Sequence, residues 1–145
     1  MAKTFRATSK LKSKIIEFEG CKLNAYKCPA GVWTIGVGHT KGVRQGQRIT
    51  ERTALEYLAQ DLKPCEEAVN NLSVCTTQGQ FDALVDFAFN LGETKLQKST
   101  LLKKIKAEAK ESEIRYEFSR WVYSNGKKLA GLVKRREWEA DTYFS

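Results

Sequence analysis

The stretch EFEGCKLNAYKCPAGVWTIGVGHT, residues 17–40, decides the fold of the N-terminal part of the chain. Apolar residues at helical spacing lead up to it, and Gly20 follows Glu19 at the place just past a helix end where glycine is favoured. Farther on, the turn residues PAG precede WTIGV, in which apolar residues alternate with threonine and glycine at the period of a strand. The sequence therefore predicts a short helix that ends at Glu19, followed by a small β-hairpin or sheet over roughly residues 23–43.

The pattern is helical from about residue 50 to the end of the chain. Thr50 can cap a helix with leucines at positions 55, 58 and 62, and the capping box TQGQ opens an apolar helix that Gly92 ends. Three more helices are expected, at 99–109, 112–123 and 131–142. We therefore predict an α+β fold that forms one domain over residues 1–145, with a small lobe that contains the hairpin at about 11–60 and a larger helical lobe at about 61–145.

The chain is strongly basic for its 145 residues, with 25 Lys and Arg against 17 Asp and Glu and a net charge of +8. This balance favours a polyanionic partner, such as nucleic acid, an anionic membrane surface or an acidic cell-wall polymer. The N-terminus MAKTFRATSKLKSKII is positively charged but has no apolar core, so we expect neither a secretory signal nor a membrane-spanning segment. The expected location is the cytoplasm, unless another component releases the protein.

Four cysteines, at positions 21, 28, 65 and 75, are spaced unlike any zinc-binding pattern, and the single histidine, His39, adds little to them. We therefore expect no metal and no cofactor. Free thiols are the default in the cytosol, whereas in an oxidising place Cys65 and Cys75 would be the pair most easily bridged. The spacing of the cysteines leaves both alternatives open.

Two residues of the opening stretch have side chains suited to catalysis. Glu19 is expected at a helix C-terminus, where the negative end of the helix dipole disfavours a charged carboxylate, so its side chain is suited to act as a general acid. The alternative is an ordinary solvated glutamate. Thr34 carries the one hydroxyl on a strand face otherwise made of glycine, where it could orient a water molecule or a substrate hydroxyl, or simply serve as a strand former.

The stretch EGCKLNAYKCPAGVWTIGVGHT closely resembles the signature of the phage-type lysozymes, the muramidase endolysins. In that family the chemistry is carried by a Glu, an Asp or Cys after eight intervening residues, and a Thr after five more. Those positions are Glu19, Cys28 and Thr34 in this chain. Later blocks resemble the family in the same order: QFDALVDFAFNLG, STLLKKI and EFSRWVYSNGKKLAGLVKRREWE. The resemblance therefore extends from about Leu11 to the end of the chain.

The resemblance implies a lysozyme-like fold with a cleft between the two lobes, and peptidoglycan as the substrate. The bond cut would be the β-1,4 link between N-acetylmuramic acid and N-acetylglucosamine. By resemblance, Glu19 protonates the glycosidic oxygen, Thr34 helps to hold the attacking water, and His39 supports the site. Arg135 is similar to the arginine that reaches the catalytic Glu from the C-terminal lobe, with Arg136 as the alternative. A phage or prophage product of this kind would act as a monomer, lyse the host cell, and depend on a hole-forming membrane protein for its release.

Cys28 occupies the position at which glycosidases usually carry a second carboxylate. Its thiolate could be a general base that activates water, its sulfur could be a nucleophile that forms a covalent glycosyl intermediate, or the residue could be structural beside Pro29. The resemblance favours the first role, because relatives with Asp at this position invert the anomeric centre. The base rate for an isolated cysteine favours the structural role. The sequence leaves the choice between these roles open, and with it the choice between inversion and retention.

Two other functions compete with hydrolysis. The first is a wall-binding protein that keeps the fold without activity, and Cys28 in place of an acid is its only support. The second is a nucleic-acid-binding domain, which the positive charge suggests, but the chain lacks any recognisable helix-turn-helix, zinc or RNA-binding signature. We therefore predict an enzyme that binds peptidoglycan and not nucleic acid.

Overall fold

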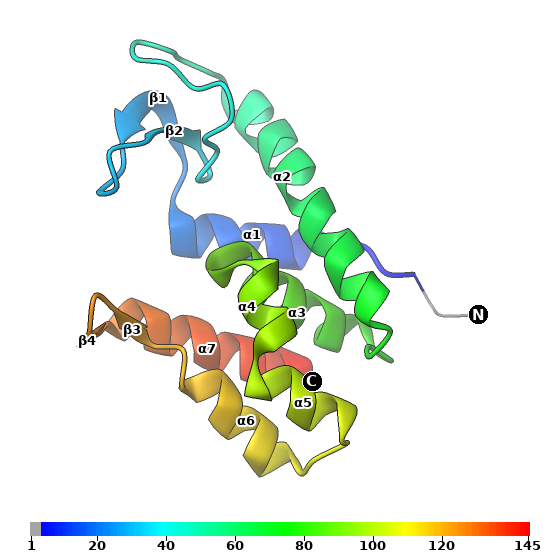
Figure 1. Cartoon of the computed structure of the whole chain (residues 1–145). Coiled ribbons are helices and arrows are strands. Elements are labelled where there is room, and N and C mark those ends of the chain that lie inside the picture. Colours follow the sequence, from blue (N-terminus) through cyan, green and yellow to red (C-terminus); the bar gives the residue numbers. More distant parts are fainter. Residues whose placement is uncertain (1–3) are drawn as a thin grey trace. The chain divides into compact units, whose positions relative to one another are not determined.

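The computed structural model describes residues 4–145. Its elements follow one another in the order α1 (Ser9–Glu19), β1 (Lys22–Lys27), β2 (Trp33–Gly36), α2 (Glu51–Leu72), α3 (Gln78–Leu91), α4 (Glu93–Lys98), α5 (Thr100–Lys106), α6 (Glu111–Ser119), β3 (Tyr123–Ser124), β4 (Lys127–Lys128) and α7 (Ala130–Tyr143) (Figure 1). The chain divides into two compact units, one of Ser9–Pro64 and one of Cys65–Ser145 with the described residues that precede Ser9. This mixture of helices and small antiparallel sheets is the α+β class that the sequence predicts.

Helix α1 ends where the sequence predicts. The N–H of Gly20 donates to the carbonyl oxygen of Ile16 at 2.7 Å, and Gly20 has a φ of +78°, which favours glycine. Leu11 and Ile15, one helical turn apart, are its buried residues. Glu19 is therefore the last residue of the helix, next to a backbone that turns sharply away from the helix axis.

The hairpin of β1 and β2 is antiparallel, with Lys27 opposite Trp33. Strand β2 stops at Gly36 and does not continue through the predicted range. Ile35 and His39 exchange two backbone hydrogen bonds, of 2.8 and 2.9 Å, across a tight turn. The φ angles of +63° at Gly36 and +71° at Gly38 explain why glycine occupies both positions. The glycines therefore shape a turn, and the prediction that they line one face of a continuous strand is wrong.

Helix α3 is the centre of the helical unit. Its residues from Phe81 to Ala88 are all buried, and it packs most extensively against α7 (Figure 1). The hydroxyl oxygen of Thr77 caps the helix by accepting from the N–H of Gln80 at 3.1 Å. The side chain of Gln80 accepts from the N–H of Thr76 at 2.8 Å, one residue farther back than a standard capping box. The predicted helix start is thus confirmed, with a small change in its hydrogen bonding.

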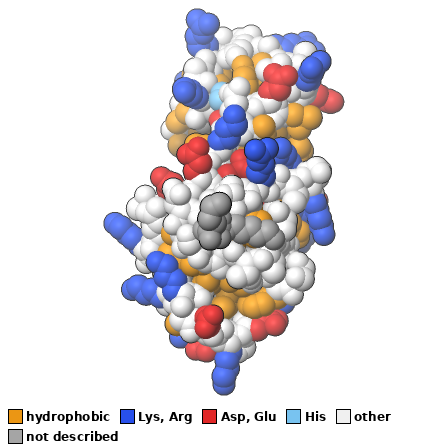
Figure 2. Space-filling view, turned by 90° about the vertical axis from the view of Figure 1, so that its right-hand side faces the viewer, with side chains coloured by type: hydrophobic (Ala, Val, Ile, Leu, Met, Phe, Trp, Pro, Cys, Tyr) orange, Lys and Arg blue, Asp and Glu red, His pale blue; other side chains and the backbone are white. Residues whose placement is uncertain are grey.

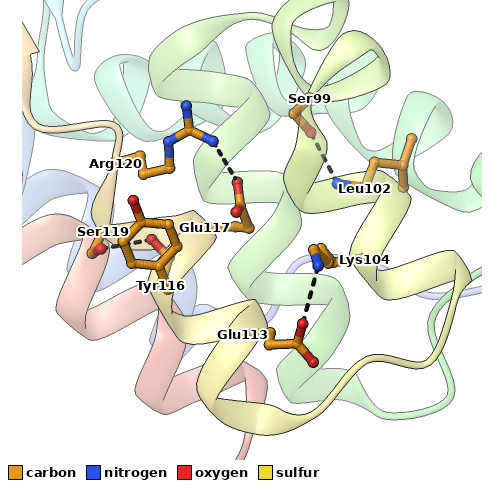
Figure 3. A network of polar contacts seen from close by, with 8 residues as sticks. All are labelled: Ser99, Leu102, Lys104, Glu113, Tyr116, Glu117, Ser119 and Arg120. Atoms are coloured by element: carbon orange, nitrogen blue, oxygen red, sulfur yellow. Dashed lines mark hydrogen bonds and ion pairs between the residues drawn. The ribbon is translucent and has the colours of Figure 1, made fainter.

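Helices α5 and α6 are shorter than predicted, whereas α7 extends slightly beyond its predicted range. Lys104 on α5 donates to the carboxylate of Glu113 on α6 at 3.0 Å, and this ion pair joins the two helices (Figure 3). The predicted helix 112–123 stops at Ser119, because the chain then enters the hairpin of β3 and β4. Asn125 and Gly126 have φ angles of 51° and 77° in its turn, and an Asn-Gly pair is a strong hairpin signal. The Asn-Gly pair therefore indicates this hairpin in the sequence, but the helical spacing of the apolar residues before it led to the prediction of a longer helix.

The described segment before α1 is hydrogen-bonded to the helical unit and packs against it. The N–H of Phe5 donates to Asn70 Oδ1 and the side-chain amide of Asn70 donates to the carbonyl oxygen of Phe5, both at 3.0 Å. Thr8 donates its hydroxyl to Asp82 at 2.6 Å. The ring of Phe5 also stacks on Phe81, with centroids 5.4 Å apart. These contacts explain why the segment belongs with Cys65–Ser145 and not with the helix that it precedes.

The four cysteines are unbonded, Cys65 and Cys75 included, so the structure has the free-thiol alternative. Between residues 4 and 145, no helix has the length and apolarity needed to cross a membrane. On the face shown in Figure 2, Lys and Arg side chains are spread among acidic and apolar ones and do not form one continuous patch.

Candidate active site

Glu19 lies at the C-terminal end of α1 and is exposed. Its Oε1 atom is 3.8 Å from the position that a Cβ atom would take at Gly38. A Cβ atom there would be in ordinary van der Waals contact with the carboxylate, so the backbone of the turn passes close to Glu19. The turn that ends β2 therefore places a bare stretch of backbone next to the predicted general acid.

Cys28 lies in the connection between β1 and β2. Its N–H donates to the carbonyl oxygen of Val32 at 3.0 Å, and its own carbonyl oxygen accepts from the N–H of Gly31 at 2.8 Å. Thr34, on β2, donates its hydroxyl to the same Val32 oxygen at 3.0 Å. The Thr34 hydroxyl also lies near the Cys28 sulfur, where it helps to lower the pKa of the thiol. The structure thus brings two of the predicted site residues together on one closed turn.

This turn favours the ionised form of the Cys28 thiol. Hydrogen bonding from the backbone of Val32 is the largest influence and lowers the pKa of the thiol, and the backbone of Ala30 and the Thr34 hydroxyl act in the same direction. Partial burial opposes them without reversing the shift. By contrast, burial raises the pKa of the Cys75 thiol to about 11. Since the thiolate is the basic and nucleophilic form of cysteine, Cys28 lies in a surrounding suited to chemistry and Cys75 does not.

The burial of β2 differs from the predicted alternation. Thr34 is buried together with the three residues that follow it, so inward and outward positions do not alternate there. Packing against α2 is the reason, because a Cβ atom at Gly36 would lie 3.3 Å from the Cβ atom of Ala54. Trp33, the first residue of β2, is half-buried, with the ammonium of Lys27 5.4 Å from its ring centroid.

His39 is buried and engaged on both ring nitrogens. Its Nδ1 atom is 2.8 Å from Asp61 Oδ2, and its Nε2 atom is 3.0 Å from the carbonyl oxygen of Lys41. The imidazole stacks on the ring of Tyr57, with centroids 4.2 Å apart. Because its backbone also pairs with Ile35, the residue connects α2 to the turn that carries Gly38. This arrangement is that of a structural support for the turn.

Arg135 and Arg136, the two candidate arginines, are buried on α7 and have different partners. Arg135 donates from Nε and Nη2 to the two carboxylate oxygens of Asp86, at 3.0 and 2.8 Å. Arg136 donates from Nη2 to Asn90 at 2.7 Å and to Glu139 at 2.9 Å. The helical unit therefore separates the two guanidinium groups, although they are adjacent in sequence.

The acids of this cluster differ in charge. Burial by itself would raise the pKa of Asp86, but hydrogen bonds from Glu139 and Arg135 outweigh it and hold the pKa below its ordinary value. Burial, together with the hydrogen bond to Asp86, raises the pKa of Glu139 well above its ordinary value, despite the nearby guanidinium of Arg136. A hydrogen bond between two carboxyl groups requires one proton, so Glu139 donates and Asp86 accepts.

Three residues of these surroundings were not predicted from the sequence: Asp61, Asp86 and Glu139. Asp86 had a detectable signal, since it is an acid within a helix whose neighbours are almost all apolar. Asp61 had none, because it lies 22 positions from its histidine partner on an ordinary amphipathic helix. Within the unit Ser9–Pro64, Glu19 offers a carboxyl group and Cys28 a thiol, and within the helical unit Asp86 holds the guanidinium of Arg135 in place.

Comparisons with known proteins agree on one family. The chain matches the family model for phage lysozyme over residues 16–139. It is 40% identical over 136 residues to the endolysin of Acyrthosiphon pisum secondary endosymbiont phage 1, which covers 90% of this chain and 92% of that protein. The solved endolysin from Escherichia coli O157:H7 phage FAHEc1 has a TM-score of 0.89 at 36% identity, covering 100% of this chain and 97% of that one. The muramidase domain of SpmX from Asticaccaulis excentricus has a TM-score of 0.88 at 36% identity, covering 97% and 98%.

These matches confirm the lysozyme-like fold that the signature around Glu19 implies. The matched region extends from within α1 to within α7, so it includes the hairpin with Cys28 and Thr34 as well as both arginines. The relatives are named as endolysins and a muramidase domain, which places the chain among enzymes that act on peptidoglycan. By sequence and by structure alike, this chain belongs to the phage lysozyme family and is a peptidoglycan hydrolase.

Proposed function

We propose that this enzyme hydrolyses the β-1,4 bond between N-acetylmuramic acid and N-acetylglucosamine, with Glu19 as the general acid. The carboxyl proton of Glu19 passes to the glycosidic oxygen as the bond from that oxygen to the anomeric carbon breaks. Two features of the structure support this role. Glu19 is exposed at the C-terminal end of α1, and the turn backbone at Gly38 passes close to its carboxylate.

The turn around Cys28 is the observation that carries the mechanism. Its backbone and the Thr34 hydroxyl lower the pKa of the Cys28 thiol, so the thiolate forms more readily than that of an ordinary cysteine. In the proposed step, this thiolate takes a proton from water as the water oxygen attacks the anomeric carbon opposite the leaving group. The sulfur forms no bond to the sugar, and the product has the inverted configuration.

The other residues of the signature support these two groups. Thr34 shares its turn with Cys28, so its hydroxyl can orient the attacking water. His39 holds the turn next to Glu19 through its bonds to Asp61 and Lys41. By the family signature alone, Arg135 is assigned a supporting role in the reaction, as a fixed positive charge.

Substitutions of Cys28 test the role of the sulfur. Cys28→Asp should hydrolyse purified walls and give inverted products by anomeric NMR, because it restores a carboxylate base. Cys28→Ser should lose about 100-fold or more in rate, the usual contribution of a general base. Full activity of Cys28→Ser would exclude a chemical role for the sulfur. A product of retained configuration would instead identify Cys28 as a nucleophile.

Glu19→Gln tests the acid, and Glu17→Gln is its matched control. Glu17 lies two residues earlier on the same helix, where it is exposed and pairs with Lys14 at 3.3 Å. Glu19→Gln should abolish the clearing of peptidoglycan, whereas Glu17→Gln should clear it as the wild type does. Mass spectrometry of the digested walls then identifies the bond, because a muramidase leaves reducing N-acetylmuramic acid ends. Anhydromuramic ends or reducing N-acetylglucosamine ends would contradict the proposal.

We further propose that the enzyme is a monomer that lyses the host as a phage or prophage endolysin, and that it waits in the cytoplasm for a hole-forming membrane protein. Its similarity to the endolysin of an endosymbiont phage supports this biological role. Expression in bacteria should leave cells intact until a pore-forming protein is co-expressed, and then lyse them. Export of the protein when it is expressed alone would contradict this part of the proposal, and light scattering checks the monomer.

A further inference from the structure

Two adjacent arginines on α7 are buried in the same cluster, yet each is held by its own acid. Arg135 and Arg136 are 4% and 1% exposed, so neither charge is balanced by water. Asp86, which is fully buried on α3, accepts from two nitrogens of Arg135. Arg136 is tied to Asn90 and to Glu139. A buried guanidinium requires a charged or polar partner, and this pairing decides where each one points.

The contact between Asp86 and Arg135 fixes a direction as well as a charge. A guanidinium group is planar, and two parallel hydrogen bonds from Nε and Nη2 to one carboxylate set both its plane and its position. Arg136 does not compete for Asp86, because its guanidinium lies 5.3 Å from the ring centroid of Phe87 and bonds elsewhere. Asp86 therefore selects one of the two arginines and holds it in one orientation.

We propose that Asp86 is a positioning residue of the reaction, which acts by orienting the guanidinium of Arg135. This inference rests on the role proposed above for Arg135. Asp86 itself does not take part in proton transfer, since its carboxylate is fully buried and its oxygens accept hydrogen bonds from Arg135. Its contribution is preorganisation, because a cation that is held in place costs no reorganisation when charge develops at the reacting centre.

Asp86→Asn is the main test, and Asp82→Asn is its matched control. Both acids are buried on α3, and Asp82 instead accepts from Thr8 and Gln78. Asp86→Asn should lower kcat by about 10- to 100-fold with KM nearly unchanged, since small misplacements of positioning groups have effects of this size. Asp82→Asn should keep kcat. Both variants should be checked by circular dichroism and thermal unfolding, so that the kinetic effect is compared at equal folding.

A double-mutant cycle with Arg135→Gln separates positioning from a general effect on the fold. If Asp86 acts through Arg135, adding Asp86→Asn to Arg135→Gln should lower kcat no further. Additive losses in the cycle would overturn the inference, as would an unchanged kcat in Asp86→Asn. If Asp86→Asn does not fold, Arg135→Lys decides the question. Lysine keeps the charge but cannot make the bidentate contact, so wild-type activity in Arg135→Lys would also overturn it.

Failure of the inference and failure of the proposed function give different results. Activity that survives Glu19→Gln contradicts the proposed function, whatever Asp86 does. Loss of activity in Glu19→Gln with none in Arg135→Gln contradicts the role of the arginine and therefore this inference. Loss of activity in both of those variants but none in Asp86→Asn contradicts the positioning role alone.

Discussion

Glu139→Gln should remove the part of the loss of folding stability with rising pH that Glu139 causes. Glu139 is fully buried, and burial together with its hydrogen bond to Asp86 raises the pKa of Glu139 well above its ordinary value of 4.5. Above pH 4.5 the unfolded chain therefore releases a proton that the folded chain retains. Stability falls with rising pH wherever the folded state binds more protons, by about 1.4 kcal/mol for each pH unit and each proton. Glutamine keeps the shape and the neutral hydrogen bond but has no proton to lose.

The assay is urea unfolding of wild type and Glu139→Gln at intervals between pH 5 and pH 7. The unfolding free energy of the variant, relative to wild type, should increase by about 1.4 kcal/mol per pH unit while Glu139 stays protonated in the folded protein. Asp86 does not disturb this comparison. Its lowered pKa gives stability that is present above its ordinary value of 3.8 and is lost only as the pH falls below it.

A difference that stays constant from pH 5 to pH 7 would refute the reasoning, because it would mean that Glu139 is ionised in the folded protein. Its ion contact with Arg136, with Nε and Oε1 2.9 Å apart, would then dominate over burial. Glu137→Gln is the control variant, since it removes a carboxylate from an exposed position of the same helix. This variant shows how the loss of an exposed negative charge changes the unfolding free energy.

Three further predictions concern the small unit and the thiols. With a pKa of about 11, about one Cys75 thiol in a thousand is ionised at pH 8. Iodoacetamide should therefore label Cys28 at least about tenfold faster than Cys75 in the folded protein, as measured by peptide mapping. Equal labelling rates would contradict the environments assigned to the two thiols. Asp61→Asn should lower the unfolding free energy by about 1.5–3 kcal/mol, the usual value of a hydrogen bond to a charged group, and an unchanged denaturation midpoint would show that the bond to the buried histidine contributes nothing. Gly36→Ala should lower the unfolding free energy by roughly 1–2 kcal/mol because of the positive φ, and by a further amount because the new Cβ atom contacts α2. Gly42→Ala, with a φ of +71° and open space around it, should show only the loss due to φ in the same unfolding assay.

The features that the sequence predicts well are those set by neighbouring residues. The end of α1 is one example, because a glycine after the last helical residue accepts the positive φ that the cap needs. The start of α3 is another, since Thr77 and Gln80 cap it within four residues. Glu19, Cys28 and Thr34 lie within one short helix–hairpin segment, and their catalytic roles stay predictions.

Predictions fail where packing against a distant element decides the outcome. The alternation along WTIGV predicts one buried and one open face, but α2 covers β2 so closely that four consecutive residues are buried. The hydrogen-bond partners of His39 and Arg135 could not be predicted for the same reason. Asp61 lies 22 residues from His39 and Asp86 lies 49 residues from Arg135, and no local pattern relates such positions.

The two acids of α3 nevertheless show how far a sequence can go toward such contacts. A charged residue in an apolar helix is costly to bury alone, so each acid implies a donor from elsewhere in the chain. The structure supplies one for each: the Thr8 hydroxyl for Asp82 and the guanidinium of Arg135 for Asp86. The implied donor for Asp86 must come from an element that packs against α3, and α7 packs against it most extensively while carrying two arginines in its first half. Once the packing of α3 on α7 is known, a buried acid and a pair of arginines are enough to infer the cluster, although the choice between the two arginines still requires the coordinates.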